Sequence, residues 1–137
     1  MNENNIQKAG GILLQDRKFM LEKHGGNDTY VVPGGKLEIG ETPEQALVRE
    51  FQEEFHLSLL PTNLEALGIF EAQAVHSPDK VVTIYTFLVT TWSGELQLDD
   101  GIEEVLWVNS KNIHNYAVSS IALANVLPLL LAKGLID

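Results

Sequence analysis

The sequence predicts an α+β fold, an α/β/α sandwich in which a mixed β-sheet lies between helices. One observation is an amphipathic helical pattern in the first half of the chain, with strand-like runs rich in β-branched and aromatic residues on both sides of it. The other is an apolar helical stretch near the C-terminus. No internal linker is long or polar enough to mark a domain boundary, so we expect a single domain over residues 1–137.

The N-terminal third reads as strands joined by short polar turns. We predict a strand near residues 9–14, a second near 18–23, and a polar loop over 24–28. A short β-branched strand over residues 30–32 then stops at the Pro-Gly-Gly turn of 33–35. Glycines in that turn allow a phosphate or metal to approach the main chain closely, because no Cβ stands in the way.

A helix is predicted to begin at Pro43. Thr42 and Gln45 have the spacing of a capping box, and proline at the first helical position loses no hydrogen bond. The apolar side chains that follow recur at every fourth position, on one helical face: Leu47, Phe51 and Phe55.

Beyond this helix the pattern returns to strands. We predict strands near residues 67–75, 80–92 and 105–108, with a loop at 77–79. An apolar helix is expected over 119–135, kinked or divided at Pro128. Core packing is the leading interpretation of this helix, and a homodimer surface is the alternative. Four aromatic side chains of the strand region are interpreted as core residues, with stacking on a nucleobase as the alternative: Phe70, Tyr85, Phe87 and Trp107.

Glu50, Glu53 and Glu54 project from a different face of the predicted helix than its apolar stripe. Like charges at i and i+4 destabilise an isolated helix by roughly 0.2–0.5 kcal/mol, an objection that a bound cation removes. Hard divalent ions such as Mg²⁺ and Mn²⁺ prefer carboxylate and carbonyl oxygens. The three glutamates, with the carbonyl of Gly34, therefore predict a metal site.

Residues 35–57 closely resemble the signature of the Nudix hydrolases. That signature is Gly, five residues, Glu, seven residues, Arg-Glu, an apolar residue, any residue, Glu-Glu, any residue, Gly, and an apolar residue. His56 stands where the family has its second glycine, a position that usually needs the left-handed conformation. The positions in register are Gly35, Glu41, Arg49, Glu50, Phe51, Glu53, Glu54 and Leu57.

The resemblance implies a role for each matching residue. Arg49 would orient the acidic side chains through a salt bridge, and Glu41 would support that arrangement. Mg²⁺ is the implied cofactor, with Mn²⁺ able to substitute. The implied metal ligands are Gly34, Glu50, Glu53 and Glu54.

The implied reaction is metal-dependent hydrolysis of a nucleoside diphosphate linked to another group X. The candidates for the general base are Glu50, Glu53 and an acidic residue of the 99–104 loop, of which Glu103 is our choice. Lys23 and His24 are candidates for contact with substrate phosphates, with ordinary surface charge as the alternative, and Gly35 allows a phosphate to approach. The catalytic group predicted from the sequence is Glu41, Arg49, Glu50, Glu53 and Glu103.

Substrate identity depends on residues outside the motif. Residues 72–75 lack the proline and tyrosine signatures of the ADP-ribose and dinucleoside polyphosphate subfamilies. The leading prediction is therefore a nucleoside triphosphate, canonical or oxidised, that is cleaved to a nucleoside monophosphate and diphosphate. The alternatives are an ADP-ribose or nucleotide-sugar pyrophosphatase and a non-catalytic nucleotide-binding domain. A diphosphate isomerase on the same fold would use a cysteine, and this chain has none.

Composition restricts the partners and the compartment. The net charge of −10 argues against duplex nucleic acid as a partner, because phosphate backbones require a basic surface. A small nucleoside diphosphate derivative remains compatible when metals neutralise both sides. The absence of cysteine fits a reducing compartment. The first residues do not resemble a secretory signal and no apolar run approaches membrane-spanning length, so we expect a cytoplasmic enzyme without membrane contact.

Overall fold

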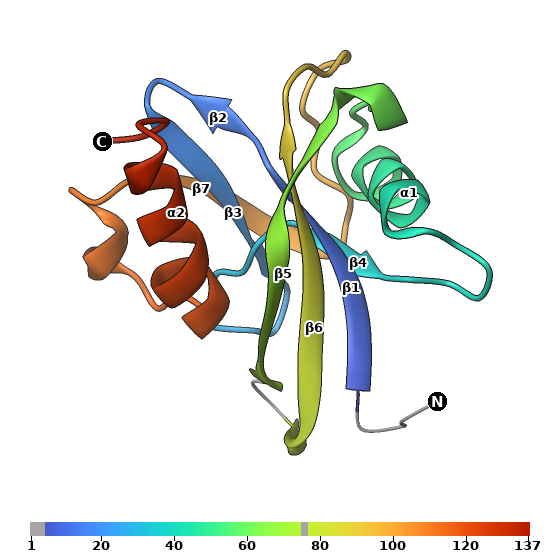
Figure 1. Ribbon diagram of the computed structural model, residues 1–137, viewed down its shortest axis with the longest axis horizontal. Helices are drawn as coiled ribbons and strands as arrows, with labels where there is room; N and C mark the ends of the chain where they lie inside the picture. The colour runs from blue at the N-terminus through green and yellow to red at the C-terminus, as the bar shows by residue number, and fades with distance from the viewer. Residues whose placement is uncertain (1–4, 75–76) are drawn as a thin grey trace.

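The computed structural model describes residues 5–74 and 77–137. Two sheets lie in its centre, with helix α1 (Pro43–Phe55) on one side and helix α2 (Leu127–Ala132) on the other (Figure 1). This arrangement confirms the predicted α+β sandwich. The strands are β1 (Asn5–Ile12), β2 (Leu14–Gln15), β3 (Lys18–His24), β4 (Gly34–Lys36), β5 (Leu64–Ala74), β6 (Ser77–Val89) and β7 (Ile102–Val108).

The strands form two sheets rather than the single sheet that we expected. One is mixed, with the order β4-β1-β6-β5, and the other is antiparallel, with the order β2-β3-β7. Strand β1 is parallel to β6, and the other pairs are antiparallel. Leu13 lies between β1 and β2, so the strand predicted over residues 9–14 is divided between the two sheets. The chain thereby crosses from one sheet to the other within a few residues.

The Pro-Gly-Gly segment is partly a strand and not only a turn. Residues 30–32, predicted as a strand, pair only through isolated bridges from Tyr30 and Val31, whereas Gly34 and Gly35 pair with β1 in strand β4. Gly34 has a φ of +144°, and a Cβ built on it would lie 1.9 Å from the carbonyl oxygen of Ala9. Only glycine allows the backbone to pass so close to β1.

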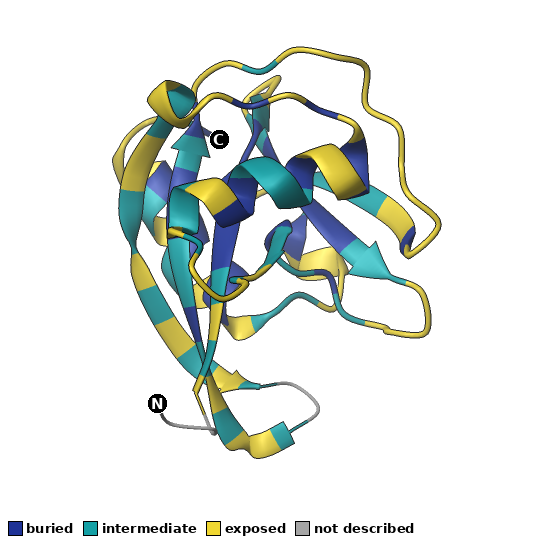
Figure 2. Ribbon diagram, turned by 90° about the vertical axis from the view of Figure 1, so that its right-hand side faces the viewer, coloured by how far each residue is buried: buried dark blue, intermediate teal, exposed yellow. Residues whose placement is uncertain are grey.

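Helix α1 begins and ends as the sequence indicates. The Thr42 hydroxyl accepts a hydrogen bond from the Gln45 backbone N–H, and the Gln45 side chain accepts one from the Thr42 N–H, which completes the capping box. His56 follows the helix in the left-handed conformation, with φ 58° and ψ 30°. The predicted stripe of Leu47, Phe51 and Phe55 is fully buried. Figure 2 shows the buried face of α1 turned toward the sheets.

The strands after α1 differ from prediction at their ends. Residues 77–79, predicted as a loop, begin β6, and Ser77 pairs with Ala74 of β5. Pro78 is tolerated there because it lies near the start of the strand. Strand β6 ends at Val89, whereas the prediction extended to Trp92, and β7 starts at Ile102 rather than at 105. Val75, the last residue of the strand predicted over 67–75, lies outside the described residues.

The C-terminal helical segment runs through Pro128 without a break. A π-helical stretch, η3 (Ala122–Val126), leads into α2, and the Leu127 N–H donates to the Ala122 carbonyl oxygen. The irregularity expected at Pro128 therefore takes the form of a wider turn just before it. Ile121, Val126 and Leu130 are buried in the core, which confirms core packing as the role of this face. No helix in the described part of the chain is long and apolar enough to cross a membrane.

The core has two parts. One cluster fills the space between α1 and the sheets and includes Leu47, Phe51 and Phe55. The other lies under the C-terminal helical segment and includes Phe19 and Leu21 of β3. Phe70, Tyr85, Phe87 and Trp107 are buried in or packed against these clusters, as predicted.

Candidate active site

Arg49 organises the acidic residues around helix α1. Its Nε and Nη2 donate to the two carboxylate oxygens of Glu41 at 2.8 and 3.0 Å. Its Nη1 donates to Glu50 at 2.9 Å and to Glu53 at 3.2 Å, and its Nη2 also donates to the Lys36 carbonyl oxygen at 3.0 Å. The hydrogen bonds from Arg49 are the main reason that the pKa of Glu41 is lowered. One guanidinium thus joins the loop before the helix to two of its glutamates.

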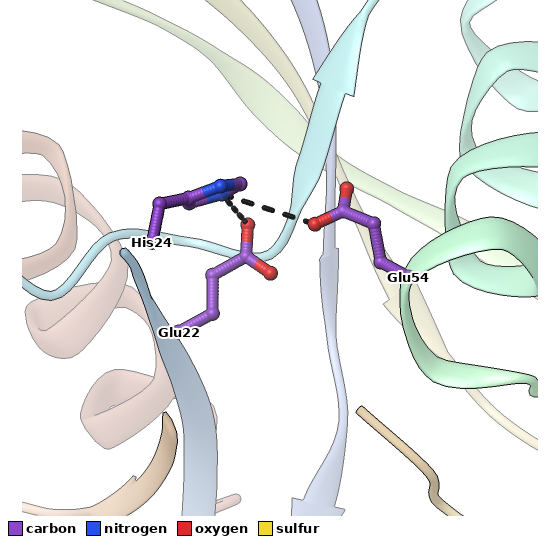
Figure 3. A group of neighbouring side chains, drawn as sticks. All are labelled: Glu22, His24 and Glu54. Atoms are coloured by element: carbon purple, nitrogen blue, oxygen red, sulfur yellow. Dashed lines mark hydrogen bonds and ion pairs between the residues drawn. The ribbon is translucent and has the colours of Figure 1, made fainter. Parts of the chain in front are cut away.

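A second group brings Glu22 and His24 of strand β3 together with Glu54 of α1 (Figure 3). The His24 Nε2 lies 2.8 Å from Oε1 of Glu22 and 3.8 Å from Oε2 of Glu54. Glu22 is 1% exposed and Glu54 is 9% exposed. Burial is the main cause that raises the pKa of Glu54, and the neighbouring Glu50 and Glu22 carboxyls raise it further. The hydrogen bond with Glu22 raises the pKa of His24.

The residues present fit a divalent cation. Oε2 of Glu22 and Oε2 of Glu54 are buried and have no hydrogen-bond partner among the described residues. Buried charged oxygens are costly unless they are paired or coordinate a metal. Glu50 and Gly34 line the same hollow as Glu54, so carboxylate and carbonyl oxygens of the kind that hard cations prefer converge there. The hollow is lined by Lys8, His24, Gly34, Gly35, Lys36, Glu50, Glu54, Asp99, Gly101 and Ile102.

A cleft of about 290 Å³ adjoins this hollow. Its walls come from both sheets and from the start of the C-terminal helical segment, and they combine apolar and short polar side chains. The apolar contribution includes Ile6, Val82 and Ile84, and the polar contribution includes Ser119 and Ser120. The residues that line both spaces are Lys8, His24, Gly34, Gly35 and Lys36.

Residues 4–130 match the Nudix domain family. The chain belongs to the Nudix family. An 8-oxo-dGTP diphosphatase of Escherichia coli is 46% identical over 95 residues, which cover 66% of this chain and 70% of that protein. An ADP-ribose pyrophosphatase of Methanocaldococcus jannaschii is 32% identical over 110 residues, covering 78% of this chain and 63% of that one.

Solved Nudix structures support the fold. The structure described as a MutT protein from Methanosarcina mazei superimposes with a TM-score of 0.79 at 16% identity and covers 97% of this chain and 98% of that chain. The family and its named diphosphatase relatives establish this protein as a Nudix hydrolase. Nudix hydrolases depend on divalent metals, and the acidic hollow described above is consistent with that dependence.

The structure separates the sequence-predicted residues of this Nudix enzyme into two groups. Gly34, Gly35, Glu50, Glu54 and His24 line the hollow, whereas the side chain of Glu53 is 59% exposed and contacts Arg49. Lys23 points elsewhere: its Nζ lies 3.7 Å from Glu103 and 3.3 Å from Glu104. It also stacks over the Tyr30 ring at 5.3 Å. Glu103 and Lys23 therefore pair with each other and are not among the residues that line the hollow.

Three ionisable residues at or beside the hollow were not singled out from the sequence. Lys8 lines it from β1, Lys36 lines it from β4, and Glu22 adjoins it through His24. Asp99, which lines it from the loop before β7, was predicted only as one member of the 99–104 loop. A signal for Glu22 was present, because this carboxylate directly follows the apolar residues Phe19, Met20 and Leu21 in a buried strand. Ionisable residues in such positions are almost never fully buried unless they are paired. For Lys8 and Lys36 the local sequence offers no comparable signal.

Proposed function

We propose that this Nudix hydrolase cleaves nucleoside triphosphates to a nucleoside monophosphate and diphosphate, with Mg²⁺ as cofactor. An oxidised guanine nucleotide is the first substrate to test, because relatives from Escherichia coli, Haemophilus influenzae and Proteus vulgaris are 8-oxo-dGTP diphosphatases. The cysteine-free composition further favours a cytoplasmic location.

The main observation in support of this proposal is that the cleft and the acidic hollow share a border. A nucleotide has an uncharged base and sugar at one end and a polyphosphate at the other. The cleft offers apolar walls with short polar groups, and the adjoining hollow offers carboxylates and two lysines. A substrate that lies across the border would place its base and sugar in the cleft and its phosphates at the hollow. Lys8 and Lys36, which pair across β1 and β4, would face those phosphates.

The proposed metal ligands are the Gly34 carbonyl oxygen and the carboxylates of Glu50, Glu53 and Glu54. A divalent ion held there neutralises phosphate charge and lowers the pKa of a bound water. Arg49 and Glu41 act as positioning residues, because their hydrogen bonds hold Glu50 and Glu53 in one arrangement. The half-buried position of Glu50 in the hollow keeps its carboxylate close to the expected position of the phosphates.

The general base must lie within hydrogen-bond reach of the attacking water. The predicted candidates are Glu50, Glu53 and an acidic residue of the 99–104 loop, in which Glu103 was our choice. The lining of the hollow favours Asp99 within that loop. Asp99 lines the hollow with Glu50 and Glu54, whereas Glu103 lies against Lys23. A comparison of Asp99→Asn with Glu103→Gln tests which loop acid contributes. We expect the larger loss of kcat from Asp99→Asn if the base comes from this loop.

A second candidate substrate is ADP-ribose. The observation in its favour is the 32% identity to the Methanocaldococcus jannaschii ADP-ribose pyrophosphatase over 78% of this chain. A non-catalytic nucleotide-binding domain is a weaker alternative, because such a domain has no need to retain the complete acidic set around Arg49.

The deciding experiment is product analysis with a panel of nucleotides. The panel contains canonical and oxidised nucleoside triphosphates, ADP-ribose and a nucleotide sugar, each with Mg²⁺, with Mn²⁺ and with a chelator. We expect monophosphate and diphosphate from one triphosphate, with loss of turnover in the chelator and in Glu50→Gln. Glu65→Gln is the control, because Glu65 is exposed on β5. Nucleotide binding without turnover of any substrate would contradict the proposal.

A further inference from the structure

Glu22 and His24 lie where the cleft meets the acidic hollow: Glu22 lines the cleft, and His24 lines both. The Nudix motif assigns no role to either residue. Both side chains come from β3, in the sheet that does not contain β4. Glu54 comes from α1 and points toward them, so the three side chains converge from two sides (Figure 3). One potential ligand atom from each residue lies within 4.8 Å of the others.

Glu22 is buried, and one of its oxygens lacks a partner in the described part of the chain. Its side chain is 99% buried, and its Oε2 has no hydrogen-bond partner among the described residues. The other oxygen of Glu22 contacts only one ring nitrogen, that of His24, at 2.8 Å. A buried carboxylate oxygen without a partner is disfavoured, and coordination of a metal would remove the penalty. Oε2 of Glu54, which is also buried and unpartnered, faces the same space.

The spacing of the three groups suits a single ion. Ligand atoms about 2.1 Å from one ion lie about 3.0 Å apart in an octahedral site and about 3.4 Å apart in a tetrahedral one. The two distances from the His24 Nε2, 2.8 Å to Glu22 and 3.8 Å to Glu54, lie on either side of these values. Small side-chain rotations would therefore bring all three atoms into coordination distance.

We propose that Glu22, His24 and Glu54 form a mixed nitrogen and oxygen site that binds a first-row transition-metal ion, such as Mn²⁺ or Co²⁺, in preference to Mg²⁺. An imidazole nitrogen is a good ligand for transition metals, whereas Mg²⁺ selects oxygen ligands. The Glu54 carboxylate places this ion next to the site of phosphate chemistry. The position of this ion beside the reacting phosphates rests on the proposed function, whereas metal binding by Glu22 and His24 does not.

Two metal-free arrangements compete with this proposal. Glu54 could remain protonated and donate a hydrogen bond to a neighbouring carboxylate, or Lys8, which lines the same hollow, could neutralise the cluster. Neither arrangement uses the His24 nitrogen as a ligand. Under either arrangement, loss of the imidazole would not change the relative affinities of the protein for the different divalent ions.

The test is metal binding by the full chain, measured without nucleotide. Calorimetric titrations with Mg²⁺, Mn²⁺ and Co²⁺ give the affinities, and the visible absorption of bound Co²⁺ reports whether a nitrogen ligand is present. The variants are His24→Gln and the isosteric Glu22→Gln. His114→Gln is the matched control, because His114 is an exposed histidine on the short helix η2 (Ile113–Asn115).

We expect the wild-type protein and His114→Gln to bind Co²⁺ and Mn²⁺ more tightly than Mg²⁺. His24→Gln should weaken Co²⁺ binding by about tenfold or more and change its spectrum, and should weaken Mg²⁺ binding by less than about threefold. Glu22→Gln should weaken binding of Mn²⁺ and Co²⁺, because it removes a negative ligand. If buried Glu22→Gln does not fold, the half-exposed His24 variant still decides the question.

The proposal is overturned if His24→Gln and His114→Gln bind all three ions alike, with the same Co²⁺ spectrum. It is also overturned if the wild-type protein has no preference for Co²⁺ or Mn²⁺ over Mg²⁺. Nucleotide hydrolysis is measured separately. If nucleotides are hydrolysed but His24 does not contribute to metal binding, only this inference is contradicted. If metal binding depends on His24 but no nucleotide is hydrolysed, only the proposed function is contradicted.

Discussion

Gly35 of β4 lies directly against the carboxylate of Glu50 on α1. A Cβ built on Gly35 would be 2.4 Å from Cδ of Glu50 and 2.5 and 2.6 Å from its two oxygens. Real Cβ atoms do not approach other groups so closely, so any side chain at residue 35 must displace Glu50. The first glycine of the Nudix motif and its first helical glutamate, fifteen positions apart in the chain, are therefore coupled by direct contact.

The first prediction concerns this contact. Gly35→Ala should push the Glu50 carboxylate out of its position and lower kcat/KM by about 10–100-fold, the range typical when the surroundings of a metal ligand are altered. Metal affinity, measured by titration, should fall with activity. Gly25→Ala is the control, because a Cβ on Gly25 would have only the Gly101 carbonyl oxygen nearby, at 3.9 Å. Equal activity in the two variants would show that Glu50 does not need this position.

The second prediction concerns the planar guanidinium group of Arg49, which contacts both carboxylate oxygens of Glu41. Arg49→Lys keeps the charge but loses the bidentate contact with Glu41, so Glu50 and Glu53 lose a common donor. We expect kcat to fall by about 10–100-fold with a smaller change in KM, as for a residue that positions other groups. Steady-state kinetics with saturating metal measure both quantities.

A double-mutant cycle separates positioning from general damage to the fold. Glu41→Gln should lower kcat in the same way, and the Arg49→Lys and Glu41→Gln double variant should lose less than the sum of the single losses. Glu38→Gln is the control: its Oε1 lies 3.7 Å from Arg49 Nη1, and its side chain is 67% exposed. Additive losses, or an equal loss in Glu38→Gln, would contradict a shared role for Arg49 and Glu41.

The parts of the site that the sequence could predict are those held by one continuous segment. Glu41, Arg49 and Glu50 lie on or beside one capped helix, so their spacing alone brings them together. Glu22 and Asp99 could not be placed in this way. They approach α1 only through contacts between segments that are distant in the sequence. His24 of β3 lies 3.8 Å from Glu54, and the Asp99 N–H donates to the Glu54 carbonyl oxygen.

The distinction between local signals and contacts of distant segments also explains the errors in the predicted strands. The capping box at Thr42 is a local signal, and it gave the correct start of α1. The division of the strand at Leu13 depends on which sheet each half joins, and strand propensity does not determine that choice. The strand at Gly34 depends on the close approach of β1, whereas glycine in a sequence indicates a turn equally well. In both cases the strand with which a segment pairs, and not its intrinsic β-propensity, determined where the strand lies.

The third prediction concerns the buried Glu54 carboxylate in the absence of metal. Because the pKa of Glu54 is raised in the folded protein, the folded state binds more protons than the unfolded state above the ordinary carboxylate pKa. The contribution of protonated Glu54 is therefore complete at low pH and is lost as the pH rises toward the folded pKa. In chelator, wild-type stability should fall between about pH 6 and about pH 9, by up to about 1.4 kcal/mol per pH unit from this group.

Glu54→Gln removes the titration and should be more stable than wild type in chelator at the upper end of this range. Added metal should raise the melting temperature of the wild type and raise that of Glu54→Gln by less, because the variant lacks one metal ligand. Glu65→Gln, on the exposed side of β5, is the control and should keep both the pH dependence and the response to metal. Thermal unfolding across the pH series measures all three proteins. A pH dependence in Glu54→Gln that equals that of the wild type would refute this explanation.

The fourth prediction concerns His56, the one residue that departs from the Nudix motif. His56 adopts φ 58° and ψ 30° after the last turn of α1, and its N–H donates to the Gln52 carbonyl oxygen at 3.2 Å. This conformation costs a residue with a Cβ about 1–2 kcal/mol and costs glycine little. Glycine, however, loses more conformational entropy on folding, which offsets part of the gain. His56→Gly should therefore stabilise the protein by about 0.5–1 kcal/mol and raise its melting temperature by about 2–4 °C.

His56→Ala is the matched comparison, because alanine keeps the Cβ but removes the imidazole. It should be no more stable than wild type, so the gain in His56→Gly can be assigned to the backbone conformation and not to loss of the ring. Denaturant unfolding of the three proteins with a common m-value gives the differences in free energy of unfolding. If glycine and alanine stabilise equally, the ring of His56, rather than its left-handed backbone, is the source of the strain.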